Sequence, residues 1–235
     1  WVLVPDKNPK SGRREFTFGD DRQGNPEQRT EPDFWIACYP ITCAQFQAFL
    51  DAPDGFSNAP WWQGLAALPE HRGEAGGQQF KHWNHPRERV SWYDAVAFCR
   101  WLTERAKEHP DLLPRDPDHS REWKITLPTE GQWEKTERGH DGIQYPRDGD
   151  KYKSGYPTID ETLTTARAAY LKRTTAVGMY PQGVSPYGIA DLSNNLLEWC
   201  LNEYDNPERV QLEGDAWRVL RGGSWFSFEL EAYVP

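Results

Sequence analysis

A closely spaced pair of histidines and the four cysteines are the first candidates for transition-metal ligands in this protein. His82 and His85 have the spacing His-x-x-His, which can bring two imidazoles to one ion. No third ligand is placed nearby, so we interpret both as ordinary surface or hydrogen-bonded histidines. The cysteines form no Cys-x-x-Cys pair, and 4 in 235 residues are too few for a disulfide framework. We expect reduced thiols at all of them, namely Cys38, Cys43, Cys99 and Cys200.

Acidic side chains are frequent, and some are adjacent, as in Asp20-Asp21 and Asp160-Glu161. Acid–base catalysis needs two carboxyl groups in different environments that face one pocket. Spacing alone does not establish that arrangement, and we interpret these pairs as solvated loop charges. The sequence also lacks a Gly-x-Ser-x-Gly turn, a Gly-x-Gly-x-x-Gly motif and a phosphate loop. These residues therefore predict no catalytic motif of those classes.

Composition restricts the class of protein further. Lys and Arg number 27 against 36 Asp and Glu, which gives a net charge of −9 and argues against nucleic-acid partners and anionic membranes. No apolar run approaches the ~18 residues of a membrane-spanning helix, so we expect no membrane insertion. Residues 1–6 do not resemble a signal peptide. With few cysteines, this favours a cytoplasmic location; the oligomeric state stays open.

Three capping patterns predict the starts of helices, because each pairs a hydroxyl side chain with a polar side chain three residues later. They are Thr42–Gln45, Ser91–Asp94 and Thr129–Gln132. Apolar residues at helical spacing follow the first, at positions 46, 49 and 50. For the second helix the pattern predicts an apolar face made of Trp92, Ala95, Val96, Cys99, Leu102 and Ala106.

Short apolar runs between these helices predict strands. The segments are 14–19, 34–39, 187–192, 198–200 and 217–221. With 19 Gly and 19 Pro, the chain should contain many turns and little regular structure. We therefore expect an α+β fold that is rich in loops, with few short helices and many short strands.

Five motifs follow one another in an order that identifies a family. They are Tyr39-Pro40-Ile41-Thr42 with Gln45-Phe46, Val90-Ser91-Trp92-Tyr93-Asp94-Ala95 with Cys99 and Trp101-Leu102, Leu127-Pro128-Thr129-Glu130 with Trp133-Glu134, Tyr187-Gly188-Ile189-Ala190-Asp191-Leu192 with Asn195 and Glu198-Trp199, and Arg221-Gly222-Gly223-Ser224-Trp225. In this order they resemble the formylglycine-generating-enzyme/sulfatase-modifying-factor family. The resemblance covers essentially the whole chain and implies the C-type-lectin fold.

The ends of the chain add two expectations to this resemblance. Residues 1–19 resemble the opening strand pair of the family, and the chain stops at Pro235, where members usually continue into a final strand. The chain also begins without Met. We expect a single C-type-lectin-like domain over residues 1–235 that lacks its last strand and is compatible with belonging to a longer chain.

The resemblance also identifies what this chain lacks. Oxygenases of the family carry two cysteines just after the Arg-Gly-Gly-Ser motif, and these thiolates bind the copper ion that activates oxygen. The first aligns with Ser227 and the second near Ala232. Because a hydroxyl does not replace a soft thiolate ligand of Cu(I), we expect no copper, no formylglycine-forming reaction and no enzymatic activity.

A calcium site is implied at the turn that begins with Asp191. By resemblance its ligands are the carboxylates of Asp191 and Glu198 and the backbone carbonyls of Asn194 and Leu196. Oxygen ligands of this kind suit calcium. The alternative is a tight turn in which Asp191 caps backbone amides and Glu198 pairs with an arginine.

The C-terminal segment is the candidate ligand-binding surface. Catalytically empty members of this fold include the variable proteins of diversity-generating retroelements, which display a hypervariable segment around the Arg-Gly-Gly-Ser-Trp motif. By that resemblance we expect a non-catalytic protein that binds a protein or other macromolecular ligand through Trp225, Phe226, Ser227, Phe228, Glu229, Leu230, Glu231 and Tyr233. Among these we expect Trp225 to lean towards the core, with Phe226, Phe228 and Tyr233 at the surface. Two alternatives stay open: a family oxidoreductase or sulfoxide synthase domain with an altered active site, and a catalytically dead partner domain.

Overall fold

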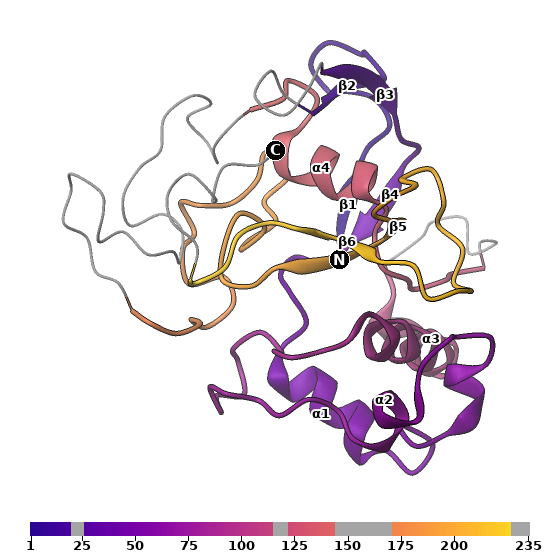
Figure 1. Cartoon of the computed structure of the whole chain (residues 1–235). Coiled ribbons are helices and arrows are strands. Elements are labelled where there is room, and N and C mark those ends of the chain that lie inside the picture. The colour runs from indigo at the N-terminus through magenta and orange to yellow at the C-terminus, as the bar shows by residue number, and fades with distance from the viewer. Residues whose placement is uncertain (20–25, 115–121, 144–170, 227–235) are drawn as a thin grey trace.

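The computed structural model describes residues 1–19, 26–114, 122–143 and 171–226 (Figure 1). Within these ranges the strands form three two-stranded antiparallel sheets. The pairs are β1 (Val2–Val4) with β4 (Phe34–Ile36), β2 (Glu15–Phe18) with β3 (Glu27–Thr30), and β5 (Glu198–Glu203) with β6 (Arg218–Arg221). The expected opening strand pair is therefore wrong, because β1 and β2 each pair with a later strand.

The expected strand at residues 187–192 is also wrong. These residues form a turn, since Gly188 and Asp191 have φ of 85° and 66°, in the left-handed region that interrupts an extended backbone. A single hydrogen bond, from the Ala190 amide to the Cys38 carbonyl at 3.0 Å, links the turn to the segment after β4. Ile189 and Leu192 are still buried, so the apolar pattern correctly predicted core residues but not their backbone conformation.

Three helices begin where the capping patterns predicted. Helices α1 (Cys43–Asp51), α3 (Trp92–Glu108) and α4 (Glu130–Arg138) each follow a complete capping box. Shorter turns of helix lie at η1 (Ala59–Trp62), α2 (Pro69–Gly73) and η2 (Pro110–Leu112). In Figure 1, α1, α2 and α3 lie together below the strands, whereas α4 lies beside β2 and β6. No helix of the described ranges is long and apolar enough to cross a membrane.

The larger core is an aromatic cluster between α1 and α3. Phe46 and Phe49 of α1 pack on Phe98 of α3, with ring centroids 5.4 and 5.7 Å apart. The buried face of α3 differs from the predicted one, because Phe98 and Trp101 are buried while Ala95, Cys99 and Leu102 are only half-buried. This helix is covered from more than one side, by α1, η1 and α2, which widens its buried stripe.

A second core surrounds Trp133 of α4. Its buried members also include Val4, Ile189, Leu192, Cys200 and Val219, so it joins β1, α4, β5 and β6. Two indole hydrogen bonds connect the cores: Trp92 donates to the Cys200 carbonyl and Trp199 donates to the Val90 carbonyl, both at 2.9 Å. Strand β5 is therefore held from both sides, and the turn that precedes it is fixed against both cores.

The four cysteines are all free thiols. Cys43 and Cys200 are buried, whereas Cys38 and Cys99 are half-buried. Burial raises the pKa of the Cys99 thiol to about 12 and raises that of Cys200 as well. A thiol with a raised pKa carries little thiolate at neutral pH, so Cys99 and Cys200 are poor nucleophiles.

Candidate functional site

Three carboxylic side chains lie close together between α4 and the start of β5: Asp191 and Glu137, which are buried, and Glu198, which is half-buried with a buried Oε1. Asp191 accepts a hydrogen bond from the Gly178 amide through Oδ2 at 2.6 Å. Glu198 accepts one from the Trp133 indole through Oε2 at 3.1 Å. Glu137 of α4 accepts a short hydrogen bond from the Ser193 hydroxyl. Backbone, indole and hydroxyl donors thus hold one oxygen of each side chain.

Burial and mutual repulsion disfavour the charged form of these three groups. Burial raises the pKa of Glu198 to about 8, with further increases from Asp191 and Glu137. Burial also raises the pKa of Glu137 to about 7 and raises that of Asp191. In the described part of the chain, no lysine or arginine contributes an opposing charge to any of the three. The buried Oε1 of Glu198 has no hydrogen-bond partner among the described residues.

No set of three His, Cys, Asp or Glu side chains in the described ranges is placed to share a metal ion, so a calcium ion here would rely on two carboxylates together with backbone carbonyls. A buried carboxylate oxygen without a donor is costly unless a cation or a proton satisfies it. Of the four ligands implied by resemblance, Asp191 and Glu198 contribute the carboxylates, while Asn194 and Leu196 lie on the turn between them. The Asn194 carbonyl accepts a hydrogen bond from the Leu196 amide at 2.9 Å.

The alternative interpretation of this turn is met only in part. Asp191 does bind a backbone amide, that of Gly178, as a capping side chain would. The described contact of Glu198 is with the Trp133 indole and not with an arginine. Asn195 supports the turn instead, since its side-chain amide exchanges hydrogen bonds of 3.0 and 3.2 Å with the Thr175 backbone.

The C-terminal segment leaves β6 through a close approach of two backbones. At Gly222, where φ is 83°, an added Cβ atom would lie 2.4 Å from the Leu192 carbonyl oxygen, so only glycine fits. The Trp225 amide then donates to the Asn195 carbonyl at 3.1 Å. Gly222 and Trp225 therefore both contact the turn that carries the carboxylates.

Trp225 and Phe226 have different environments. Trp225 is half-buried and lies edge-on against Phe80, with ring centroids 5.5 Å apart. Phe226 packs only its edge on Trp225 and is 68% exposed. The other predicted ligand-binding residues lie outside the described residues: Ser227, Phe228, Glu229, Leu230, Glu231 and Tyr233.

His82 and His85 are brought together, with ring centroids 4.5 Å apart. His85 Nδ1 lies 2.9 Å from the Thr174 hydroxyl, which in turn donates to Glu88 at 3.5 Å. Burial, together with the charges of His82 and Arg173, lowers the pKa of His85. Of the two rings, His85 has a described side-chain hydrogen-bond partner, the Thr174 hydroxyl.

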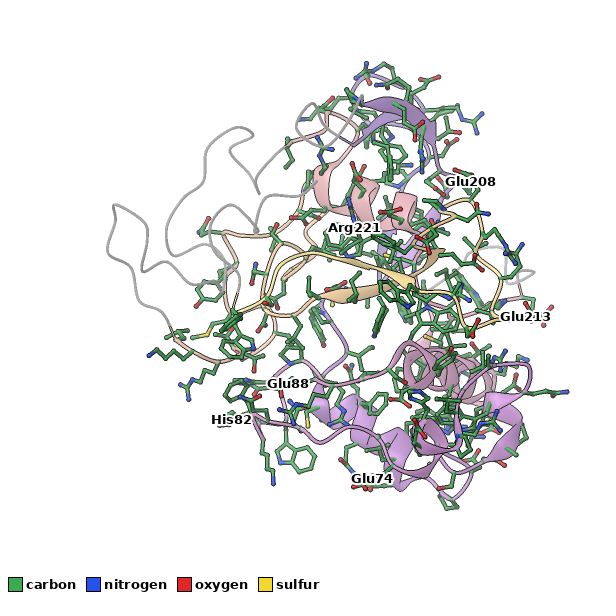
Figure 2. The ribbon with its side chains drawn as sticks, in the orientation of Figure 1. Glu74, His82, Glu88, Glu208, Glu213 and Arg221 are labelled. Carbon is green, nitrogen blue, oxygen red and sulfur yellow. The ribbon has the colours of Figure 1, made fainter. Side chains whose placement is uncertain are left out.

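A buried ion-pair network on α4 has a structural role. The Glu134 carboxylate forms ion pairs with Arg138 at 2.7 Å and with Arg221 at 2.6 Å. It also accepts a hydrogen bond from the Gly19 amide. Lys135 of the same helix donates to the Glu31 carbonyl at 3.0 Å. The network links β6, α4 and the end of β2, and Figure 2 shows Arg221 near the centre of the molecule. It fixes the strand from which the C-terminal segment departs.

Sequence analysis missed three contributors to this region. Glu137 and Ser193 complete the carboxylate cluster, and Phe80 supports Trp225. The spacing of Glu137 from Trp133, one helical turn, could have indicated a shared face of α4. Phe80 lies in an irregular loop with no periodic pattern, so no local signal could have assigned it.

The sequence matches the Sulfatase-modifying factor enzyme 1-like domain over residues 8–234. Chaperone protein LppX of Paenibacillus barcinonensis is 28% identical over 236 residues, covering 84% of this chain and 71% of that protein. Hercynine oxygenase of Mycobacterium tuberculosis is 26% identical over 224 residues, covering 83% of this chain and 46% of that protein. The chain thus spans less than half the length of hercynine oxygenase, and it also spans less than half of the chlamydial protein kinases that it matches.

The fold has a counterpart among solved structures. Treponema denticola variable protein 1 superposes with a TM-score of 0.59 at 17% sequence identity, covering 99% of this chain and 86% of the other. This likeness establishes the C-type-lectin fold expected from the ordered motifs. Because the family match runs through nearly the whole sequence, the chain belongs to the Sulfatase-modifying factor enzyme 1-like domain family.

Proposed function

We propose that this protein is a non-catalytic binding protein that displays its C-terminal segment on a C-type-lectin scaffold, as the variable proteins of diversity-generating retroelements do. One observation carries the proposal. The segment after β6 is anchored at Gly222 and Trp225, and the next side chain, Phe226, is 68% exposed. A rigid base that presents an exposed aromatic side chain is typical of a binding surface, because little entropy is lost on binding.

The proposal that no chemistry occurs rests on the residue types at two positions. The copper-binding cysteines of the resembling oxygenases correspond to Ser227 and to a position near Ala232. A serine hydroxyl is a poor ligand for a soft ion that thiolates select. Among the described thiols, Cys200 lies in the core with a raised pKa and does not substitute for them.

Calcium belongs to the proposal as a structural ion. Asp191 and Glu198 would supply carboxylates, and the carbonyls of Asn194 and Leu196 would complete the set. The unpartnered Oε1 of Glu198 and the lack of a described cation near the cluster support this assignment. The ion would fix the turn whose Asn195 carbonyl anchors Trp225, so it would act on binding through the scaffold.

Panning a random linear peptide library displayed on phage against the immobilised protein tests the binding function. We expect enriched peptides to bind the wild type and to lose at least about tenfold in affinity with Phe226→Ala, about 1.4 kcal/mol. Trp217→Ala is the matched control, because Trp217 is 79% exposed and precedes β6 at the opposite end of that strand. Peptides that bind Phe226→Ala as well as they bind Trp217→Ala would overturn the proposal.

A second candidate is a family oxidoreductase or sulfoxide synthase domain, favoured by the 26% identity to hercynine oxygenase. Oxygen consumption with a thiol substrate separates the two functions. The protein loaded in turn with copper and with iron is compared with Cys200→Ser and with a metal-free sample. Metal-dependent turnover of oxygen would overturn the non-catalytic proposal, whereas a rate equal to that of free metal would support it.

A further inference from the structure

The displayed segment adjoins two other loops, and together they form one surface. The Val177 amide donates to the Asn84 carbonyl at 3.0 Å, which joins residues 171–180 to the loop before α3. The side-chain contact between His85 and Thr174 reinforces that junction. Phe80 of the same loop supports Trp225. Residues 80–85, 171–180 and 222–226 are therefore neighbours, although they are far apart in the sequence.

This surface is cationic, in contrast to the chain as a whole. The net charge of the protein is −9, yet residues 75–87, 171–190 and 222–226 contain no Asp or Glu. Lys81, His82 and Arg173 are exposed. Within the described ranges, neither Lys81 nor Arg173 forms an ion pair.

Glu88, which directly follows residues 75–87, does not neutralise this surface. Glu88 is buried, and its Oε2 accepts hydrogen bonds from the amides of Gln79 and Phe80 at 2.7 and 3.4 Å. Figure 2 shows His82 and Glu88 on the same side of the molecule, away from Glu208 and Glu213 at the other end of the β5–β6 hairpin. The described side chains of Glu208 and Glu213 therefore lie away from this surface.

Large apolar side chains accompany these cations. Trp83 is 66% exposed, Met179 is 57% exposed and Phe226 is 68% exposed. Exposed aromatic and Met side chains on adjoining loops are typical of binding surfaces, because they gain large apolar contact when covered. Cations beside aromatic residues select a partner that offers both negative charge and apolar groups.

We propose that this surface binds an acidic peptide segment that carries aromatic or aliphatic side chains. This inference rests on the proposed binding function and assigns the chemistry of its partner. The side chains of this surface are Lys81, His82, Trp83, Arg173, Met179 and Phe226. Its cations meet the acidic groups of the peptide, and its apolar side chains cover those between them. The net charge of −9 opposes long polyanions, so a short acidic peptide fits better than a nucleic acid.

The library experiment above tests this inference through the composition of the enriched peptides. We expect acidic residues, interspersed with aromatic or aliphatic ones, to be enriched over the input library. A peptide of this kind is then labelled with fluorescein and titrated against the wild type and Lys81→Glu/Arg173→Glu. We expect the double charge reversal to weaken binding by at least about tenfold.

The matched control is Lys7→Glu/Lys10→Glu, which makes the same change in net charge on exposed residues between β1 and β2. We expect this variant to bind within about twofold of the wild type. Raising the salt concentration should weaken wild-type binding and leave the binding of Lys81→Glu/Arg173→Glu nearly unchanged. Circular dichroism of each variant shows that the fold is retained.

The outcomes separate this inference from the function on which it rests. Enriched peptides that need Phe226 but are neutral or basic, or that bind Lys81→Glu/Arg173→Glu normally, would overturn the acidic partner and leave the binding function in place. Peptides whose affinity is unchanged by Phe226→Ala would overturn both the acidic partner and the binding function. Tighter binding of a single-stranded RNA oligonucleotide than of the acidic peptide would also overturn the inference.

Discussion

The indole of Trp225 lies edge-on against the ring of Phe80, with centroids 5.5 Å apart and ring planes at 84°. This contact joins the loop before α3 to the segment that follows β6. Edge-to-face aromatic pairs contribute about 0.5–1.5 kcal/mol beyond the area they bury. The position of Trp225 therefore depends in part on a loop that has no regular structure of its own.

Replacing Phe80 should free the C-terminal segment without unfolding the protein. We expect Phe80→Ala to speed hydrogen exchange at the Trp225 amide, which is bonded to Asn195, while amides of α1 and α3 exchange at the wild-type rate. Mass spectrometry of exchanged peptides measures both. Trp217→Ala, at the other end of β6, serves as the control. Unchanged exchange at Trp225 in Phe80→Ala would show that the ring contact does not hold the segment.

The carboxylate cluster should make stability depend on pH and calcium. Burial raises the pKa of Glu137 to about 7 and that of Glu198 to about 8, above their ordinary value of 4.5. Without a cation, the stabilising contribution of the two protonated groups is fully present below pH 4.5. This contribution is lost as pH rises through 7–8. At that pH each side chain either keeps a proton that the unfolded state has released, or ionises where it is shielded from water. We expect the Tm in chelator to fall from pH 5 to pH 8.5.

Calcium should reverse this loss, because it binds the ionised carboxylates of the folded state only. At pH 8 we expect added calcium to raise the Tm, and at pH 5 to raise it less, since protons compete. Glu137→Gln is the control: it should flatten the fall in chelator relative to the wild type. A Tm in chelator that is higher at pH 8 than at pH 5, together with no response to calcium, would contradict the prediction.

Gly222→Ala should destabilise the protein more than a comparable substitution elsewhere. Gly214 has a similar φ of 87°, but an added Cβ atom there meets no atom within 4 Å, whereas at Gly222 it would lie 2.4 Å from the Leu192 carbonyl oxygen. We expect Gly214→Ala to cost about 1–2 kcal/mol of backbone strain. Gly222→Ala adds the steric contact to that strain. Urea unfolding measures the free energy of unfolding of both variants. Equal losses of stability would show that the backbones at Gly222 and Leu192 move apart without cost.

Glu134→Gln should be the most destabilising of these substitutions. Its carboxylate lies between Arg138 and Arg221, and its loss would remove the short ion pair of each buried guanidinium, although Arg221 keeps Glu130 at 3.6 Å. Removing one partner of such a pair costs about 3–5 kcal/mol. Glu104→Gln, which breaks the exposed pair with Lys107, should cost about 0–1 kcal/mol. Similar unfolding free energies for the two variants would exclude a structural role for the α4 network.

Binding of an acidic peptide should be linked to protonation of His85. Burial, His82 and Arg173 lower the pKa of His85, whose ring also faces Thr174 with Glu88 behind it. A bound anion favours the imidazolium form, so affinity should rise as pH falls below the ordinary His value of 6.5. Fluorescence titrations at pH 5.5 and 7.5 measure this, with His85→Gln as the control. An affinity that falls towards pH 5.5 would contradict the prediction.

Local sequence was sufficient to place the helices and the family. The capping boxes at Thr42, Ser91 and Thr129 are short-range hydrogen-bond patterns, so three residues of spacing determine where each helix begins. The ordered motifs predicted the family and the fold, and the family match and the solved structures confirm both. These features depend on neighbouring residues or on identity at one position.

Only the tertiary structure decided which distant groups meet. Residues 187–192 have the apolar pattern of a strand, but left-handed residues at both ends of Ile189 and Ala190 turn the chain, and the pattern predicts burial alone. Glu137 joins Asp191 and Glu198 because α4 packs across the turn, and Phe80 meets Trp225 because two loops converge. Such contacts arise from the packing of whole elements, which no local spacing encodes.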